Sequence, residues 1–198
     1  MTGKCVNKFK EWTQHWVSGM LVVALLISGK SVLAAETKQT VPPSRAVVFD
    51  IDGTLTPTPF RFWSVRTDAA NTAHYFANQG MAIFYITARV SWLQWPLGDW
   101  LEDNHFPSGQ LYLTETEADE DNHGEFKTRI LQQLKTEGWQ LEWAFGDSSS
   151  DFAAYHAAGI PQDRVYALKR EGAEQCEPGV WQLCLYGWAD FPRVESGR

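Results

Sequence analysis

The sequence predicts an α/β protein built on a doubly wound parallel sheet of about five strands. Short apolar runs, typical of strands that are buried on both faces, recur at 46–49, 81–86, 111–113, 141–145 and 165–168. Segments with helical patterns alternate with these runs, and residues that can carry chemistry follow several of them. Because parallel strands bind ligands at their carboxyl ends, we expect these residues to meet at one edge of the sheet.

The first 34 residues have the features of a secretory signal peptide. Lys4, Lys8 and Lys10 precede an uncharged, largely apolar run at 17–27, and Val32-Leu33-Ala34 offers the small residues that a signal peptidase reads. We predict cleavage after Ala34 and a periplasmic or secreted protein. The alternative is an uncleaved membrane anchor, although the run is shorter than the ~20 residues of a spanning helix.

Residues 35–44 are polar, contain Pro42-Pro43 and are predicted to form a linker, with one domain over 45–198. The leader holds four lysines and one glutamate, so its removal changes the formal net charge from −7 to −10 and leaves 164 residues. That length suffices for one core. Such an acidic chain is unsuited to nucleic acid, whose phosphates require cations, and has no general attraction to anionic lipid.

The first apolar run ends in Asp50-Ile51-Asp52-Gly53-Thr54. Strand alternation sends the two carboxylates to the same side, where they repel each other unless a cation lies between them. Gly53 lets the backbone leave the strand and approach a ligand closely. This arrangement suits a divalent metal ion and a phosphoryl group.

The helical patterns fall at 64–78, 91–104, 125–137 and 150–158, and three of them end at or near a glycine. The second is rich in tryptophan and is interrupted by Pro96. The acidic run at 115–125 carries six carboxylates and is predicted to be a solvated loop, with a calcium site as the alternative.

Three further motifs accompany these elements. Thr87-Ala88-Arg89 closes the second strand, and Phe126-Lys127 opens the third helix. Gly146-Asp147 follows the fourth strand, and Asp151 comes shortly after it in sequence. In order and spacing the four motifs resemble the haloacid dehalogenase-like hydrolases, and most closely the LNS2 domain of lipin-type phosphatidate phosphatases. The resemblance covers roughly 45–170 and implies a Rossmann-like core with little or no cap and an open site.

The resemblance also implies a role for each residue in phosphoryl transfer. Asp50 would attack phosphorus, and Asp52 would protonate the leaving oxygen and then activate water. Thr87 and Lys127 would stabilise the phosphoryl charge. The expected substrate contacts are Gly53, Thr54, Thr87, Ala88, Arg89 and Lys127. The expected Mg²⁺ ligands are Asp50, Asp52 through its carbonyl, Asp147 and Asp151, the last directly or through another ligand.

The function implied by these roles is an exported, Mg²⁺-dependent phosphomonoesterase that forms an aspartyl-phosphate. Phosphatidate or another lipid phosphate is the substrate that the lipin resemblance suggests. Two alternatives stay open. Some LNS2 domains bind phosphatidate without cleaving it, and a phosphatase in an export compartment can also act on small soluble esters.

Trp92, Trp95 and Trp100 crowd the segment beside the second motif. Their helical spacing favours packing in the core, while the functional alternative is a peripheral contact with membrane lipid near the open site.

Cys176 and Cys184 are the only cysteines outside the leader, which predicts a disulfide bond in an exported protein.

Overall fold

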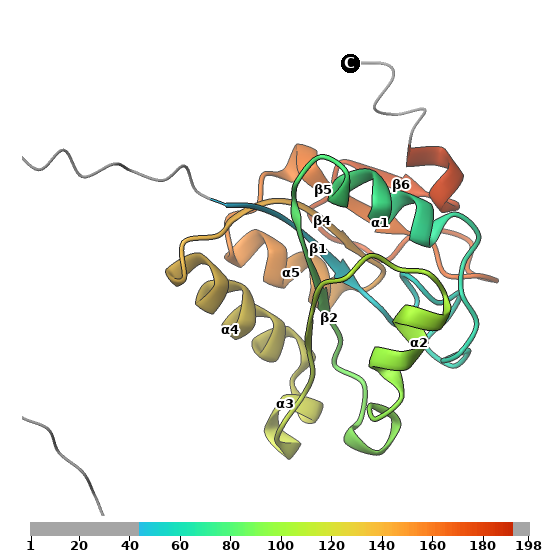
Figure 1. Cartoon of the computed structure of the whole chain (residues 1–198), viewed down its shortest axis with the longest axis horizontal. Coiled ribbons are helices and arrows are strands. Elements are labelled where there is room, and N and C mark those ends of the chain that lie inside the picture. Colours follow the sequence, from blue (N-terminus) through green and yellow to red (C-terminus); the bar gives the residue numbers. More distant parts are fainter. Residues whose placement is uncertain (1–43, 192–198) are drawn as a thin grey trace, which may run out of the picture. The chain divides into compact units, whose positions relative to one another are not determined.

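A computed structural model of the chain describes residues 44–191 (Figure 1). The predicted leader and all of the predicted linker except Ser44 lie outside the described residues. Within 44–191, no helix is long and apolar enough to cross a membrane.

The described residues form a parallel sheet of six strands in the order β3-β2-β1-β4-β5-β6. The described residues begin in the middle of the sheet with β1 and add β2 and β3 on one side of it. They then return to the other side of β1 and add β4, β5 and β6. The sheet is therefore doubly wound, as predicted, and its switch point lies between β1 and β4. The strands are β1 Arg45–Asp50, β2 Ala82–Ile86, β3 Gln110–Tyr112, β4 Gln140–Gly146, β5 Val165–Leu168 and β6 Leu183–Leu185.

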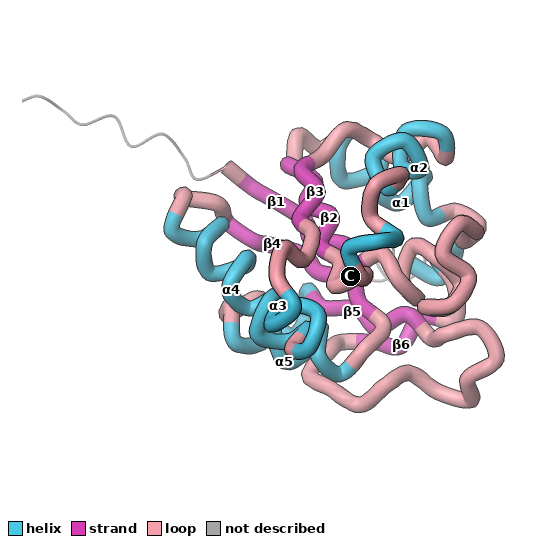
Figure 2. Tube along the Cα trace, turned by 90° about the horizontal axis from the view of Figure 1, so that it is seen from below, coloured by secondary structure: helices cyan, strands magenta, loops and turns pink. Residues whose placement is uncertain are grey.

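Helices cover both faces of the sheet, α1 and α2 on one side and α4 and α5 on the other (Figure 2). Alternate residues of β1 supply the two cores: Val47 and Phe49 face the first pair of helices, while Ala46 and Val48 face the second. The helices are α1 Ala69–Ala77, α2 Leu97–Asp103, α3 Glu117–Asp121, α4 His123–Thr136 and α5 Ser149–Ala157, with 3₁₀ turns at Ser91–Leu93, Gln162–Arg164 and Trp188–Asp190.

Three predicted helical or loop segments need correction. The segment predicted as a helix at 64–78 becomes helical only at Ala69, because Asp68 adopts a left-handed backbone conformation (φ 63°). The tryptophan-rich segment splits at Pro96 into a 3₁₀ turn and α2. The acidic run is not wholly a loop, since it holds α3, whose first turn is capped by the Thr116 side chain.

The strand β6 was not predicted. It pairs with β5, and Cys184 within it forms the predicted disulfide bond with Cys176.

Candidate active site

Strand register brings three of the predicted motifs together. Asp50 is the last residue of β1 and pairs with Ile86, so Thr87 lies just beyond the neighbouring strand end. On the other side of β1, Phe49 pairs with Phe145 of β4, which places Asp147 one residue past the end of that strand. These three side chains therefore sit at the carboxyl ends of adjacent strands, as the sequence predicted.

A tight turn carries the chain away from Asp50. The Ile51 carbonyl accepts hydrogen bonds from the backbone N–H groups of Thr54, Leu55 and Thr56. Gly53 has φ 85°, and a Cβ built on it would lie only 1.9 Å from an oxygen of Asp147. The residue must therefore be glycine, both for its backbone conformation and for the close approach of the two strand ends.

Lys127 connects the first strand with two helices. It extends from α4, is 4% exposed, and donates to Asp50 Oδ1 at 2.6 Å and to Asp151 Oδ1. Asp151 lies in the first turn of α5, where its other oxygen accepts from Ser148 N and Oγ as part of a capping box. The N-terminus of α5 thus fixes Asp151, and Asp151 and Asp50 together fix Lys127.

Burial dominates the electrostatics of this cluster. It raises the pKa of the Asp50 carboxyl well above its usual value, although the charge of Lys127 acts in the opposite direction. Burial, with the nearby charge of Asp151, also raises the pKa of Asp147 to about 6. Burial alone would raise the pKa of Asp151 too, but Lys127 outweighs it and lowers that pKa. Negative charge at this site is costly unless a cation balances it.

The cluster fits a divalent metal ion. Carboxylate oxygens of Asp50, Asp147 and Asp151 lie within 4.8 Å of one another, the spacing that a shared metal ion requires. Oδ2 of Asp50 is buried and has no hydrogen-bond partner within residues 44–191. An unpaired carboxylate oxygen among acidic neighbours is a ligand that a hard cation such as Mg²⁺ prefers.

The Asp52 carboxylate does not belong to this cluster. The Thr87 hydroxyl donates to its Oδ2 at 2.6 Å, and Arg89 donates to its Oδ1 through Nη2 at 2.6 Å and through Nε at 3.1 Å. The guanidinium of Arg89 in turn lies over the rings of Phe62 and Trp63. Thr87 and Arg89 therefore hold Asp52 in one orientation.

A pocket of about 420 Å³ opens over these residues. Its polar lining includes the four predicted catalytic residues and Asp147 but not Asp151. Apolar surface is added by Pro59, Phe60, Phe62, Val90, Trp92 and Leu93. Ala88 also lines the pocket, whereas Gly53 and Thr54 are not among its lining residues. These two residues build the turn, and their contact with substrate remains a prediction.

Arg170 was missed by the sequence reasoning. It follows β5, lines the pocket, and its Nε donates to Asp147 Oδ2. His123 at the start of α4 and Phe60 in the β1–α1 loop also line the pocket. None of the three lies in a recognisable motif, so the only available signal for Arg170 was its position at the end of the resemblance.

The three neighbouring tryptophans do not form one surface. Trp92 and Trp95 are 72% and 84% exposed, but Trp100 is buried in the core and its indole N–H donates to the Trp63 carbonyl at 3.1 Å. Trp100 must therefore be removed from the predicted lipid contact, because α2 turns it toward the sheet. The calcium alternative gains no support, since Asp119 of the acidic run pairs with Arg129.

The sequence matches a family model described as "PITM 1-3, LNS2 domain" over residues 47–169. The membrane-associated phosphatidylinositol transfer protein 3 of Homo sapiens is 24% identical over 157 residues, which is 77% of this chain. The chain spans only 16% of the length of that relative.

Solved structures share the fold at low sequence identity. The 3-deoxy-D-manno-octulosonate 8-phosphate phosphatase of Moraxella catarrhalis, solved with magnesium and phosphate ions, has a TM-score of 0.50 at 14% identity and aligns over 77% of this chain and 86% of its own. A chain of the Pnkp1/Rnl/Hen1 RNA repair complex also gives 0.50, at 17% identity, over 76% of this chain and 47% of its own. The predicted fold class is thereby confirmed.

Proposed function

The chain belongs to the LNS2 domain family and has the fold of haloacid dehalogenase-type phosphatases, and on that premise we propose that it is an exported, Mg²⁺-dependent phosphomonoesterase. The observation that carries this proposal is Asp50, a buried carboxylate that lines a pocket together with Asp52 and Lys127 and has one oxygen without a hydrogen-bond partner in the described part of the chain. A carboxylate held in this way is placed to act as a nucleophile.

Asp50 would attack the phosphorus of a phosphate monoester and form an aspartyl-phosphate, while the bond to the leaving oxygen breaks. Lys127 keeps Asp50 oriented through its 2.6 Å hydrogen bond and adds fixed positive charge beside the transferred group. Two displacements with low barriers thereby replace one difficult hydrolysis.

Asp52 would donate a proton to the leaving oxygen and later accept one from the attacking water. Its carboxylate lines the pocket and is 16% exposed, so it can be reached by substrate. Because the Thr87 hydroxyl donates a hydrogen bond to Asp52, we assign Thr87 the role of orienting this carboxylate, in addition to its predicted contact with phosphate.

Mg²⁺ would be held by Asp50 and Asp147, with Asp151 as a third carboxylate within reach. When bound, the ion would neutralise part of the negative charge of the carboxylates and of the phosphoryl oxygens. Such a cation would add to the positive charge of Arg89, Lys127 and Arg170 in a pocket whose lining also includes three aspartates, which repel a phosphate dianion.

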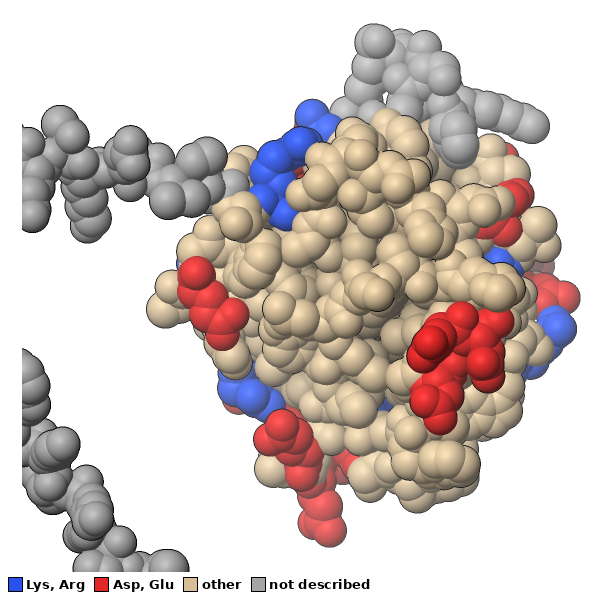
Figure 3. Space-filling model, in the orientation of Figure 1, with Lys and Arg blue, Asp and Glu red and all other residues tan. Residues whose placement is uncertain are grey.

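The apolar part of the pocket supports a lipid phosphate as substrate. Phe60 and Trp92 line the pocket and are 85% and 72% exposed, and Trp95 follows close by in sequence. Indole and phenyl rings favour the membrane interface. Charge does not assist binding to anionic lipid, because the formal net charge is −7. Figure 3 also shows an acidic patch over α2, whose acidic residues are Asp99, Glu102 and Asp103.

A second candidate function is binding of a lipid phosphate without turnover. The match to the LNS2 domain of membrane-associated phosphatidylinositol transfer proteins favours it, because a domain of a lipid-transfer protein can serve by binding lipid without cleaving it. The presence of both Asp50 and Asp52 opposes it, since a pure binder has no use for a nucleophile. A phosphatase for small soluble esters is the third candidate.

One panel separates the three candidates. Phosphate release is measured from p-nitrophenyl phosphate, nucleotides and phosphatidate in mixed micelles, with and without Mg²⁺, and the Asp50→Asn protein serves as control. We expect Mg²⁺-dependent release that is fastest from phosphatidate. Binding to phosphatidate vesicles without release would support the binder, and release from the soluble esters alone would support the third candidate.

Export rests on the leader, with the disulfide bond as supporting evidence because such bonds persist in oxidising compartments. N-terminal sequencing of protein from the periplasm or medium is expected to begin at Ala35. Protein that retains Met1 in a membrane fraction would instead indicate an uncleaved anchor.

A further inference from the structure

Three cationic side chains line the pocket, and they differ in how far they reach its surface. The side chain of Lys127 is 6% exposed and held by two carboxylates, and the side chain of Arg89 is 2% exposed and held by Asp52. The side chain of Arg170 is 31% exposed. Of the three, only Arg170 is open to an incoming anion without rearrangement of the site.

The hydrogen bonds of Arg170 leave part of its guanidinium free. Nε donates to Asp147 Oδ2, and Nη1 approaches Glu177 Oε1 at 3.5 Å. Within residues 44–191 no hydrogen bond uses Nη2. A planar guanidinium can therefore stay on Asp147 through Nε and offer its remaining N–H groups to a phosphate oxygen.

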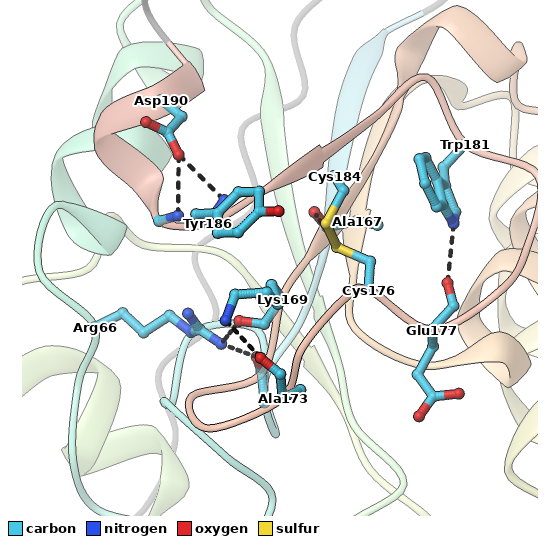
Figure 4. Close-up of a disulfide and its surroundings, with 12 residues drawn as sticks. Arg66, Ala167, Lys169, Ala173, Cys176, Glu177, Trp181, Cys184, Tyr186 and Asp190 are labelled. Atoms are coloured by element: carbon cyan, nitrogen blue, oxygen red, sulfur yellow. Dashed lines mark hydrogen bonds between the residues drawn. A yellow bond between two sulfur atoms is a disulfide. The ribbon is translucent and has the colours of Figure 1, made fainter.

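The segment that carries Arg170 has no regular secondary structure. It connects β5 with β6 over residues 169–182, where a parallel crossover commonly contains a helix. Arg66 holds its beginning through the Lys169 carbonyl at 2.8 Å, and the Lys169 ammonium donates to the Ala173 carbonyl (Figure 4). We call residues 169–182 the Arg170 loop.

The disulfide bond holds the middle of the Arg170 loop. Cys184 lies in β6, opposite Ala167 of β5, and Cys176 lies in the loop beside Glu177, the residue that approaches Arg170 (Figure 4). The bond thus ties the Glu177 side of the loop to the sheet. A bond at this position limits the conformations open to the loop, and with them those open to Arg170.

We propose that Arg170 is a phosphate-binding residue of this site and that the Cys176–Cys184 bond holds the loop that presents it. The ligand class rests on the proposed function, whereas the anion-binding geometry does not. Arg170 would contact the phosphoryl group from the β5 side of the pocket, while Lys127 is placed by α4.

The test is binding of inorganic phosphate to the full chain, measured by calorimetry with saturating Mg²⁺. Arg170→Gln should weaken phosphate binding about 10- to 100-fold, because one charge-assisted hydrogen bond and one cation are lost. Arg170→Lys keeps the charge and should weaken it less. The matched control is Arg45→Gln, which removes the same charge from a surface pair with Glu142, outside the pocket lining and outside the Arg170 loop, and should change binding less than about twofold.

The contribution of the disulfide bond is tested by a double-mutant cycle. Cys176→Ser with Cys184→Ser should weaken phosphate binding about three- to tenfold, because Arg170 then spends only part of its time in place. In the Arg170→Gln background the same pair of changes should have almost no further effect. If the losses of phosphate affinity from the two sets of changes add, or if the loss from removing the bond is explained by a lower melting temperature, the role given to the bond is wrong.

These outcomes are independent of turnover. If the unmodified protein binds phosphate through Arg170 but hydrolyses no ester, the proposed function fails and this inference stands. If Arg170→Gln binds phosphate as tightly as the unmodified protein and Arg45→Gln do, or if no form binds it, the inference is wrong.

Discussion

Single residues at this site carry charge where the fold excludes water. Asp50, Asp151 and Lys127 are each at most 4% exposed, and they are tolerated because the ammonium lies between the two carboxylates. Removing one partner from such a group leaves uncompensated buried charge, at a cost of about 3–5 kcal/mol. Asp147 lacks a comparably buried partner, since Arg170 is only partly enclosed.

The pKa of Asp147 leads to a prediction about pH and metal. Its value of about 6 in the folded protein exceeds the ordinary 3.8, so between these values the folded state holds a proton that the unfolded chain has released. The metal-free protein should therefore lose stability as pH rises through this window. Mg²⁺ needs the ionised carboxylate, so its stabilising effect should be large above the window and small at its lower end.

Melting temperatures with and without Mg²⁺, at about pH 4.5 and about pH 7.5, check this prediction. The raised pKa of Asp50 acts in the same direction as that of Asp147, and the lowered pKa of Asp151 does not interfere because it acts below 3.8. An equal Mg²⁺-induced shift at both pH values would contradict the assignment of Asp50 and Asp147 as ligands.

Two glycines allow the turn after β1 to be tested with a matched control. Gly53 and Gly80 both have positive φ, but a Cβ on Gly80 meets nothing within 4 Å, whereas one on Gly53 meets Asp147. Gly80→Ala should cost only the backbone penalty of about 1–2 kcal/mol. Gly53→Ala should cost more and should also weaken Mg²⁺ binding, because Asp147 has to move.

Urea unfolding and calorimetric Mg²⁺ titration of the two variants provide the measurement. Equal destabilisation by Gly53→Ala and Gly80→Ala, with unchanged Mg²⁺ affinity in both, would contradict the close approach of the turn to Asp147.

At the scale of elements, burial on both faces explains what the sequence could predict. Four of the five predicted strands are largely buried on both faces, β3 is a partly exposed edge strand, and all five predictions lie close to the observed bounds. The edge strand β6 has only three residues, and although Leu183, Cys184 and Leu185 form an apolar run like that of β3, no helical pattern precedes them to mark a further strand of the doubly wound sheet. The predicted start of α1 was wrong because Arg66, just before it, donates to four backbone carbonyls, three in its own segment between β1 and α1 and one at Lys169. Sequence periodicity does not record such contacts.

The segment between β2 and α2 carries the prediction about lipid. Replacing the exposed Trp92 and Trp95 by Ala should lower kcat/KM for phosphatidate in mixed micelles at least about tenfold and change it little for p-nitrophenyl phosphate, because only the lipid gains apolar contacts there. The melting temperature should stay nearly constant.

Trp100→Ala is the matched control for this pair. Because Trp100 is buried, its loss should destabilise the fold by about 3–5 kcal/mol and lower both activities together. Equal losses on the two substrates in the Trp92 and Trp95 variant would favour the soluble-ester phosphatase.

At the scale of the whole molecule, the switch point of the sheet explains why four separated motifs form one site. Asp50, Thr87 and Asp147 could be predicted because each lies at the carboxyl end of β1 or of a strand beside it. Lys127 and Asp151 could be predicted because they open helices that begin beside it. Arg170 and Phe60 could not, since they lie in irregular loops whose positions depend on tertiary contacts such as those of Arg66 and the disulfide bond.

The central claim is that Asp50 carries the phosphoryl group during turnover, and trapping the intermediate tests it most directly. Turnover of the best substrate is quenched in acid before steady state, the acyl phosphate is reduced with borohydride, and the peptides are sequenced by mass spectrometry. We predict homoserine at position 50 and no such change in the Asp50→Asn protein, which should have lost activity at least about 10³-fold while keeping its fold. Burst-phase turnover with an unmodified Asp50, or a reduced residue elsewhere in the chain, would contradict the claim.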